Sequence, residues 1–135
     1  MRWTAKQVAA FTHSYGRDGV HAETLWRPMA QRLCPEVLHA FDRDWNWGPE
    51  PLGPNWHGFA DKVEEAIKAA HAVSDETALS GLYTFANWAF LEPSSNYLPN
   101  ETMTSIGQGL CCDLQPSLWV ARFPPEITQQ IIRYA

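Results

Sequence analysis

The sequence predicts an all-α protein that forms one helical domain over residues 1–135, and three observations support this class. Apolar residues recur at intervals of three and four along most of the chain. No alternating run of β-branched residues is bounded by Asn-Gly or Asp-Gly turns, so a sheet has little support. With 135 residues, of which 45 % are hydrophobic and 19 % charged, the chain can bury one sizeable core. We expect about six or seven short helices, in an irregular bundle or a solenoid-like array of helical hairpins.

Capping residues, glycine and proline divide the first third of the chain into three predicted helices. Thr4 can cap a helix that continues until Gly16 ends it. A second helix covers about residues 20–33, and Pro28 predicts a kink or a break within it. Pro35 then takes the first position of a third helix, where its missing N–H costs little.

Two helices are predicted in the middle of the chain. The first covers residues 61–73 and carries its apolar residues on one stripe. Residues 74–77 end this helix and cap the next one, which extends to Phe90. Because the second helix is apolar nearly all round, we expect it to be the central, buried helix.

The last third of the chain begins another helix at Pro99 and a final helix at Pro125. Gly107 and Gly109 lie inside the first of these. Glycine is a weak helix former, but it lets a neighbouring helix approach closely. We therefore expect a close helix contact at these glycines.

A loop rich in tryptophan, proline and glycine is predicted at residues 45–58, and it contains Trp45, Trp47 and Trp56. Ordered loops of this length usually have a function or pack back on the domain. Tryptophan is enriched at binding hot spots, and proline lowers the entropy cost of presenting it. The alternative is that the indole rings form a lid on the core. The loop can serve both roles if one indole ring is buried and another is exposed.

The net charge of −5 is unevenly distributed along the chain. Residues 44–113 contain two basic and ten acidic residues, a balance of −8, whereas the segments before and after carry +2 and +1. An acidic surface repels phosphate, so we expect no nucleic-acid partner. It attracts a basic protein and speeds its association. The alternative is that these carboxylates are ordinary solvated helix faces.

No motif specifies a reaction, and we expect no enzyme activity, no cofactor and no metal. Glu36 and His39 form a Glu-x-x-His step, but a di-iron site needs a second step, which the sequence lacks. Cys111 and Cys112 lack the spacing of a zinc knuckle, and together with Cys34 they suggest reduced thiols. Because the sequence shows neither a secretion signal nor an apolar stretch of about 20 residues, we expect a cytoplasmic protein without membrane contact.

Four short segments and the tryptophan loop follow one another in an order that can be compared with known protein families. The segments are residues 33–36, before the loop, and 58–63, 82–88 and 107–110, after it. In this order the chain resembles small all-helical bacterial immunity proteins of toxin systems and their uncharacterised relatives, over roughly residues 25–125. The resemblance implies an all-helical fold and a non-enzymatic inhibitory role, with a cognate toxin as partner. It carries over no functional residue.

We therefore predict a cytoplasmic protein-binding module, most concretely an immunity-type inhibitor of a basic toxin or effector domain. Acidic side chains would attract the partner, and tryptophans would supply buried contact. The predicted contact residues are Trp47, Trp56, His57, Asp61, Glu64, Glu65, Asp75 and Glu76. One alternative is a helical domain that binds a small molecule or peptide in a Trp-lined cleft, with His57 as its polar group. Another is a helical subunit with a structural role.

Overall fold

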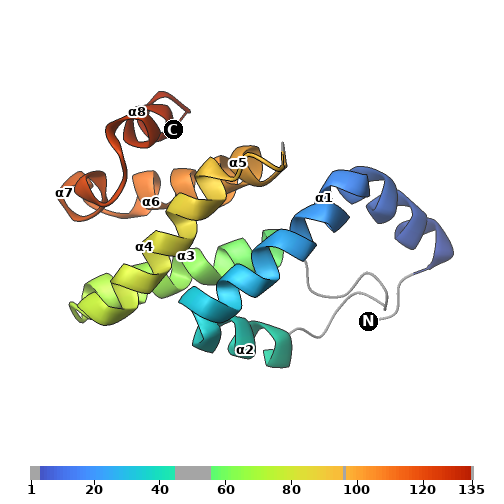
Figure 1. The fold of residues 1–135 in the computed structure, drawn as a ribbon, viewed down its shortest axis with the longest axis horizontal. Coiled ribbons are helices and arrows are strands. Elements are labelled where there is room, and N and C mark those ends of the chain that lie inside the picture. Colours follow the sequence, from blue (N-terminus) through green and yellow to red (C-terminus); the bar gives the residue numbers. More distant parts are fainter. Residues whose placement is uncertain (1–3, 45–55, 96, 135) are drawn as a thin grey trace.

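A computed structural model describes residues 4–44, 56–95 and 97–134, and all secondary structure in these ranges is helical, without a strand (Figure 1). The eight α-helices of the described chain are α1 (Ala5–Leu33), α2 (Pro35–Asp44), α3 (Trp56–Ala72), α4 (Glu76–Leu91), α5 (Tyr97–Thr102), α6 (Gln108–Asp113), α7 (Pro116–Trp119) and α8 (Pro125–Tyr134). A π-helical turn, η1 (Met103–Gly107), joins α5 to α6, and a 3-10 turn, η2 (Val120–Arg122), follows α7. The all-α prediction is confirmed, with eight α-helices rather than six or seven.

Helix α1 is one continuous helix of 29 residues, where two were expected. It begins with a capping box, in which the Thr4 hydroxyl accepts from the Gln7 amide and the Gln7 side chain accepts from the Thr4 amide. The helix continues through Gly16 and Pro28, although Figure 1 shows that it bends along its length. The buried Trp26 lies two residues before Pro28, which is exposed. None of the described helices, α1 included, is long and apolar enough to cross a membrane.

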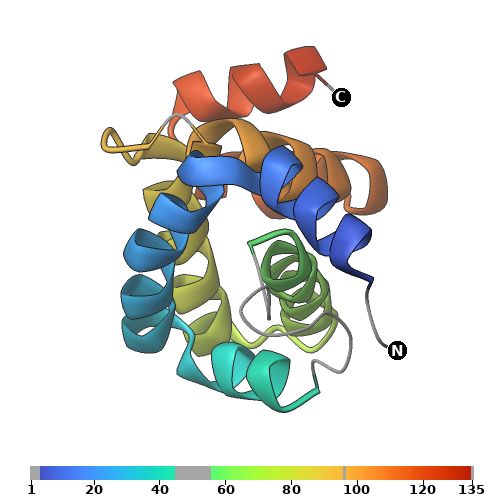
Figure 2. The same cartoon turned by 90° about the vertical axis from the view of Figure 1, so that its right-hand side faces the viewer.

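Helix α3 lies alongside α4, between α2 and the C-terminal helices (Figure 2). It packs against α1, α2, α4, η1 and α6. Helix α4 has seven buried residues against six in α3, and it packs against α1, α3 and α5. The apolar helix α4 is thus largely buried, as predicted, and it shares the centre of the core with α3.

Aromatic rings from α1, α3 and α4 meet at the centre of the core. Trp26 stacks on Phe59, with ring centroids 4.6 Å apart, and lies edge-on to Trp56 at 5.7 Å. Phe85 meets Phe59 edge-on at 5.6 Å. All four rings are essentially without exposed surface. Edge-to-face and stacked contacts of this kind add to the apolar area that the rings bury.

Helices α1 and α4 cross at a point where only glycine fits. Gly81 of α4 lies against the carbonyl group of Leu33 in the last turn of α1, and a Cβ atom on Gly81 would overlap the carbonyl oxygen. Gly107, in the π-helical turn, makes a milder contact of the same kind with Ile131 of α8. The close contact expected at Gly107 is therefore confirmed, whereas the role of Gly81 was not foreseen.

Candidate functional site

A groove lies between α2 and α3 and opens onto the first turn of α4. Its two adjoining parts have volumes of about 570 and 360 Å³ and share Glu36, Val37, Ala66 and Ala69 in their linings. The charged residues of the lining are Glu36, Glu65, Asp75 and Lys62. We call this feature the acidic groove, because three carboxylates and one ammonium group surround it.

The floor of the acidic groove is apolar and shallow because small residues line one face of α3. Ala66, Ala69 and Ala70 follow one another at intervals of three and one, and Val73 continues the line beyond the end of the helix. Val37 of α2 lies on the opposite side. The Val73 side chain is 74 % exposed, the highest value among the large hydrophobic residues of the described chain. An exposed apolar strip with a charged rim is typical of a protein contact surface.

The rim carboxylates are held by local structure and keep exposed oxygens. Asp75 caps α4, and one of its oxygens accepts from the Ala78 amide at 3.1 Å. Glu36 lies in the first turn of α2. Glu65 is 63 % exposed and makes a loose ion pair of 3.4 Å with Lys62. One turn before Glu65, partial burial and the charge of Glu65 raise the pKa of Asp61 above its ordinary value.

Glu64 was predicted as a contact residue, but it points away from the groove toward α6. Its carboxylate accepts from the Lys68 ammonium group at 2.9 Å, and Lys68 also donates to Asp113 at 2.9 Å. A Cβ atom on Gly109 would overlap this carboxylate, so the glycine provides its space. Glu64 therefore ties α3 to α6, and the two carboxylates raise the pKa of Lys68.

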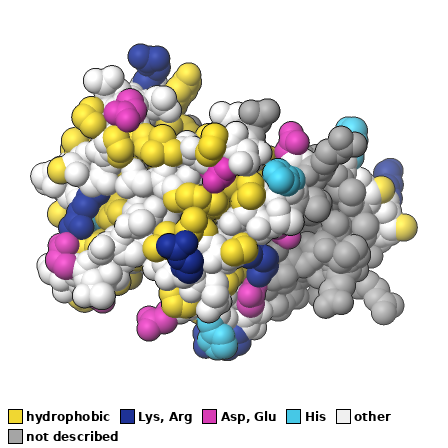
Figure 3. All heavy atoms as spheres, in the orientation of Figure 1, with side chains coloured by type: hydrophobic (Ala, Val, Ile, Leu, Met, Phe, Trp, Pro, Cys, Tyr) yellow, Lys and Arg dark blue, Asp and Glu magenta, His cyan; other side chains and the backbone are white. Residues whose placement is uncertain are grey.

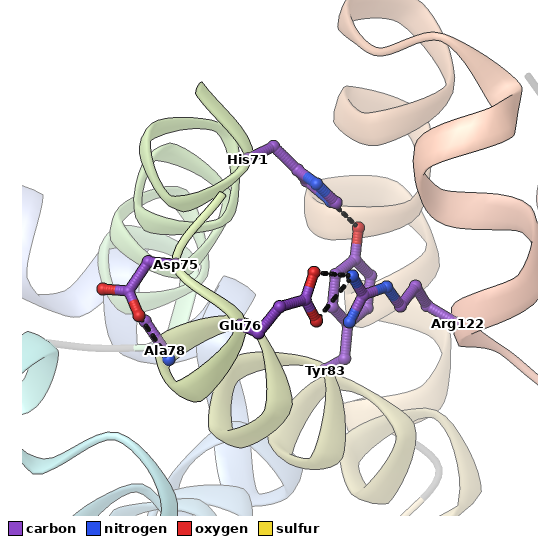
Figure 4. A network of polar contacts seen from close by, with 6 residues as sticks. All are labelled: His71, Asp75, Glu76, Ala78, Tyr83 and Arg122. Carbon is purple, nitrogen blue, oxygen red and sulfur yellow. Dashed lines mark hydrogen bonds and ion pairs between the residues drawn. The ribbon is translucent and has the colours of Figure 1, made fainter. Parts of the chain in front are cut away.

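Glu76, also predicted as a contact residue, belongs to a polar network that joins α4 to the C-terminal segment (Figure 4). Both of its carboxylate oxygens accept from the Arg122 guanidinium group, at 2.8 and 3.0 Å. The guanidinium lies over the ring of Tyr83, 5.4 Å from its centroid, and His71 shares a 2.7 Å hydrogen bond with the Tyr83 hydroxyl. The hydrogen bonds from Arg122 lower the pKa of Glu76, and burial raises the pKa of Tyr83 to about 12.

The same network makes stability depend on pH through His71. Burial and the nearby charge of Arg122 lower the pKa of His71 below its ordinary value of 6.5. The unfolded chain therefore binds this proton at a higher pH than the folded protein does. Neutral His71 therefore contributes to the free energy of unfolding. This contribution is complete above pH 6.5 and declines as the pH falls toward the pKa of the folded state.

We expect the thermal midpoint of the wild type to fall more steeply than that of His71→Gln as the pH is lowered below about 6.5. The glutamine keeps an acceptor for the Tyr83 hydroxyl but does not titrate. Thermal unfolding followed by circular dichroism at several pH values measures the difference. Parallel curves for the two proteins would contradict the assignment to His71.

The remaining predicted contact residues lie away from the acidic groove or outside the described chain. Trp56 lies in the core with 0 % exposure, so it cannot contact a partner at the surface. Helix α3 begins at Trp56, so the end of the predicted loop at residues 56–58 is helical. His57, also in the first turn of α3, bonds the Tyr97 hydroxyl at 2.8 Å and lies 3.5 Å from Glu101. Trp45 and Trp47 lie outside the described residues.

Of the predicted contact residues, the structure brings Glu65 and Asp75 to the acidic groove and leaves Asp61 one turn away on α3. Sequence reasoning missed Glu36 as a member of this surface, since it was considered only as a metal ligand. The signal was its position directly after Pro35 at a helix start, which places it on the exposed first turn.

Within the described residues, no group of three or more His, Cys, Asp or Glu side chains could hold a metal ion. The three cysteines are free, and burial raises the pKa of the Cys34 thiol to about 12. Comparisons with protein-family models, with curated proteins and with solved structures found no match to this chain. The relation to immunity proteins therefore remains a prediction from the sequence.

Proposed function

We propose that this chain is a non-enzymatic protein-binding module that receives a basic amphipathic helix of its partner in the acidic groove. One observation carries the proposal: an exposed apolar floor on α3 lies between the carboxylates of Glu36, Glu65 and Asp75. The inhibitory role, directed at a basic toxin or effector domain, rests on the resemblance to immunity proteins and on the acidic balance of residues 44–113.

A helix is the form of partner segment that suits the groove. The alanines of α3 let a third helix approach the α2–α3 pair closely, as happens when an amphipathic helix binds a hydrophobic groove. Its apolar face would cover Ala66, Ala69 and Val37. Lysine or arginine on its flanks would meet the rim carboxylates.

The floor and the rim contribute differently to such a complex. Exposed ion pairs add little affinity, typically about 0–1 kcal/mol each, but they speed association and select the partner. Affinity then comes from the apolar area that is buried on the floor. Variants of the floor should therefore change dissociation, and variants of the rim should change association.

The test uses a synthetic helix with leucine on one face and lysine on its flanks as the probe. A peptide of the same composition with scrambled order is its control. We expect the ordered peptide to shift the amide NMR signals of α2 and α3 along the groove. Ala69→Arg should weaken binding at least about ten-fold, because Ala69 is an exposed floor residue and arginine adds both bulk and like charge.

The rim is tested with Glu36→Gln, Glu65→Gln and Asp75→Asn combined, in which asparagine preserves the helix cap. Association should slow several-fold at low salt, and the difference should shrink as salt screens the charges. The matched control neutralises Asp18, Glu92 and Glu126, none of which lines the groove. Equal slowing in both triple variants, or equal binding of the scrambled peptide, would count against the proposal.

A further inference from the structure

A second cavity lies at the other end of the molecule, between α8 and the α5–η1–α6 stretch (Figure 1). Its volume is about 500 Å³, within the range of roughly 300–1,000 Å³ that is usual for small-molecule sites. We call it the α8 pocket. Its position differs from that of the acidic groove, which is built from α2, α3 and the start of α4, so it raises a separate question of function.

One wall of the α8 pocket is apolar. Phe90 and Met103 form part of this wall, and the ring of Tyr134 borders it. In the orientation of Figure 1, hydrophobic side chains gather on the surface over α4, α5 and α8 (Figure 3). A ligand with a flat apolar body would find contact here.

The other wall carries polar groups, and most of them are amides. Asn100, Gln108, Gln130 and Arg133 are among the residues that line the cavity. The Gln108 amide nitrogen donates to the Tyr134 carbonyl oxygen at 3.2 Å, which links α6 to the end of α8. Such convergent polar groups beside an apolar wall are the usual composition of a ligand site.

Charge and backbone geometry narrow the class of ligand. Arg133 is the only charged residue among the described residues that line the pocket. A guanidinium group binds a carboxylate through two parallel hydrogen bonds, and a single positive charge balances a single negative one. Met103 lies in the π-helical turn η1, and π-helical turns are frequent at functional sites.

We infer that the α8 pocket binds a small organic carboxylate, with Arg133 and the neighbouring amides on the carboxylate and Met103 and Phe90 on its apolar body. This inference does not depend on the proposed role of the acidic groove. The two features carry opposite charge, so a ligand of one is repelled by the other.

The experiment titrates the whole protein with indole-3-acetate and, separately, with its neutral analogue indole-3-acetamide. Binding is followed by NMR signals of the side-chain amides of Gln108 and Gln130 and of the Met103 methyl group. We expect the carboxylate to shift these signals and to bind at least about ten-fold more tightly than the amide. Arg133→Gln should remove most of that difference, and Arg32→Gln, on the exposed last turn of α1, should leave it unchanged.

Circular dichroism confirms that each variant is folded before the titration. Equal binding of the two probes, or equal losses in the two arginine variants, would overturn the inference. It would also be overturned if millimolar carboxylate left the three side-chain signals of the folded wild type unmoved.

Discussion

Replacement of Phe85 by alanine is expected to lower the free energy of unfolding by about 3–5 kcal/mol. Phe85 has 0 % exposure and packs against Trp56, Phe59 and Trp88, with centroid distances of 5.9, 5.6 and 5.7 Å. Truncation removes a ring from the point where α3 meets α4. The rings around it cannot close the cavity, because each is held by other neighbours.

Chemical denaturation of Phe85→Ala measures this loss. Thr84→Ala is the matched control, since it changes the adjacent, exposed position of the same helix. We expect the control to lie within about 0.5 kcal/mol of the wild type. Equal stability of the Phe85 variant and the control would show that the α3–α4 contact does not hold the core together.

Gly81→Ala is expected to destabilise the protein by about 1–3 kcal/mol, opposite to the usual effect of this substitution in a helix. Alanine normally improves an exposed helix position by about 1 kcal/mol relative to glycine. Here the new Cβ atom would overlap the Leu33 carbonyl oxygen. Backbone cannot move aside as a side chain can, so α4 and α1 would have to separate.

Gly109→Ala provides the comparison, because its Cβ atom would meet a flexible carboxylate instead of backbone. Displacing the end of the Glu64 side chain weakens its ion pair with Lys68, and the gain in helix propensity offsets that loss. We expect a small net change, measured by the same denaturation experiment. A Gly81 variant as stable as the Gly109 variant would refute the close crossing of α1 and α4.

Local signals in the sequence predicted where four of the eight described helices begin, namely α1, α2, α4 and α8. Asp75 caps α4, Pro35 begins α2 and Pro125 begins α8, as expected from short-range chemistry. The effect of glycine and proline inside a helix was predicted wrongly. Gly16 and Pro28 were expected to end or disturb a helix that the structure continues to Leu33.

The candidate site was harder to predict, since a charge count does not show where each carboxylate points. A count of acidic residues treats Glu64, Glu65 and Glu76 alike. In the structure Lys68 pairs with Glu64 one turn along α3 and also reaches Asp113, and Arg122 binds Glu76 from the C-terminal part of the chain. Likewise, the tryptophan count did not show that Trp56 lies in the core. The pairs Lys68–Asp113 and Arg122–Glu76 join residues far apart in the sequence, so only the fold reveals them.

The π-helical turn η1 has a consequence for the length of the chain. A turn with i→i+5 hydrogen bonds holds one residue more than an α-helical turn, so η1 is equivalent to a single-residue insertion. Removing one residue there would give an unbroken α-helix in which the later residues keep their present faces. If the turn instead closed to α-helical geometry with all its residues, everything after it would rotate by about 100° relative to α5, and Leu110, which now has 0 % exposure, would leave the core. A shorter homologue that lacks this residue must therefore carry its apolar positions one place earlier in the helix that follows.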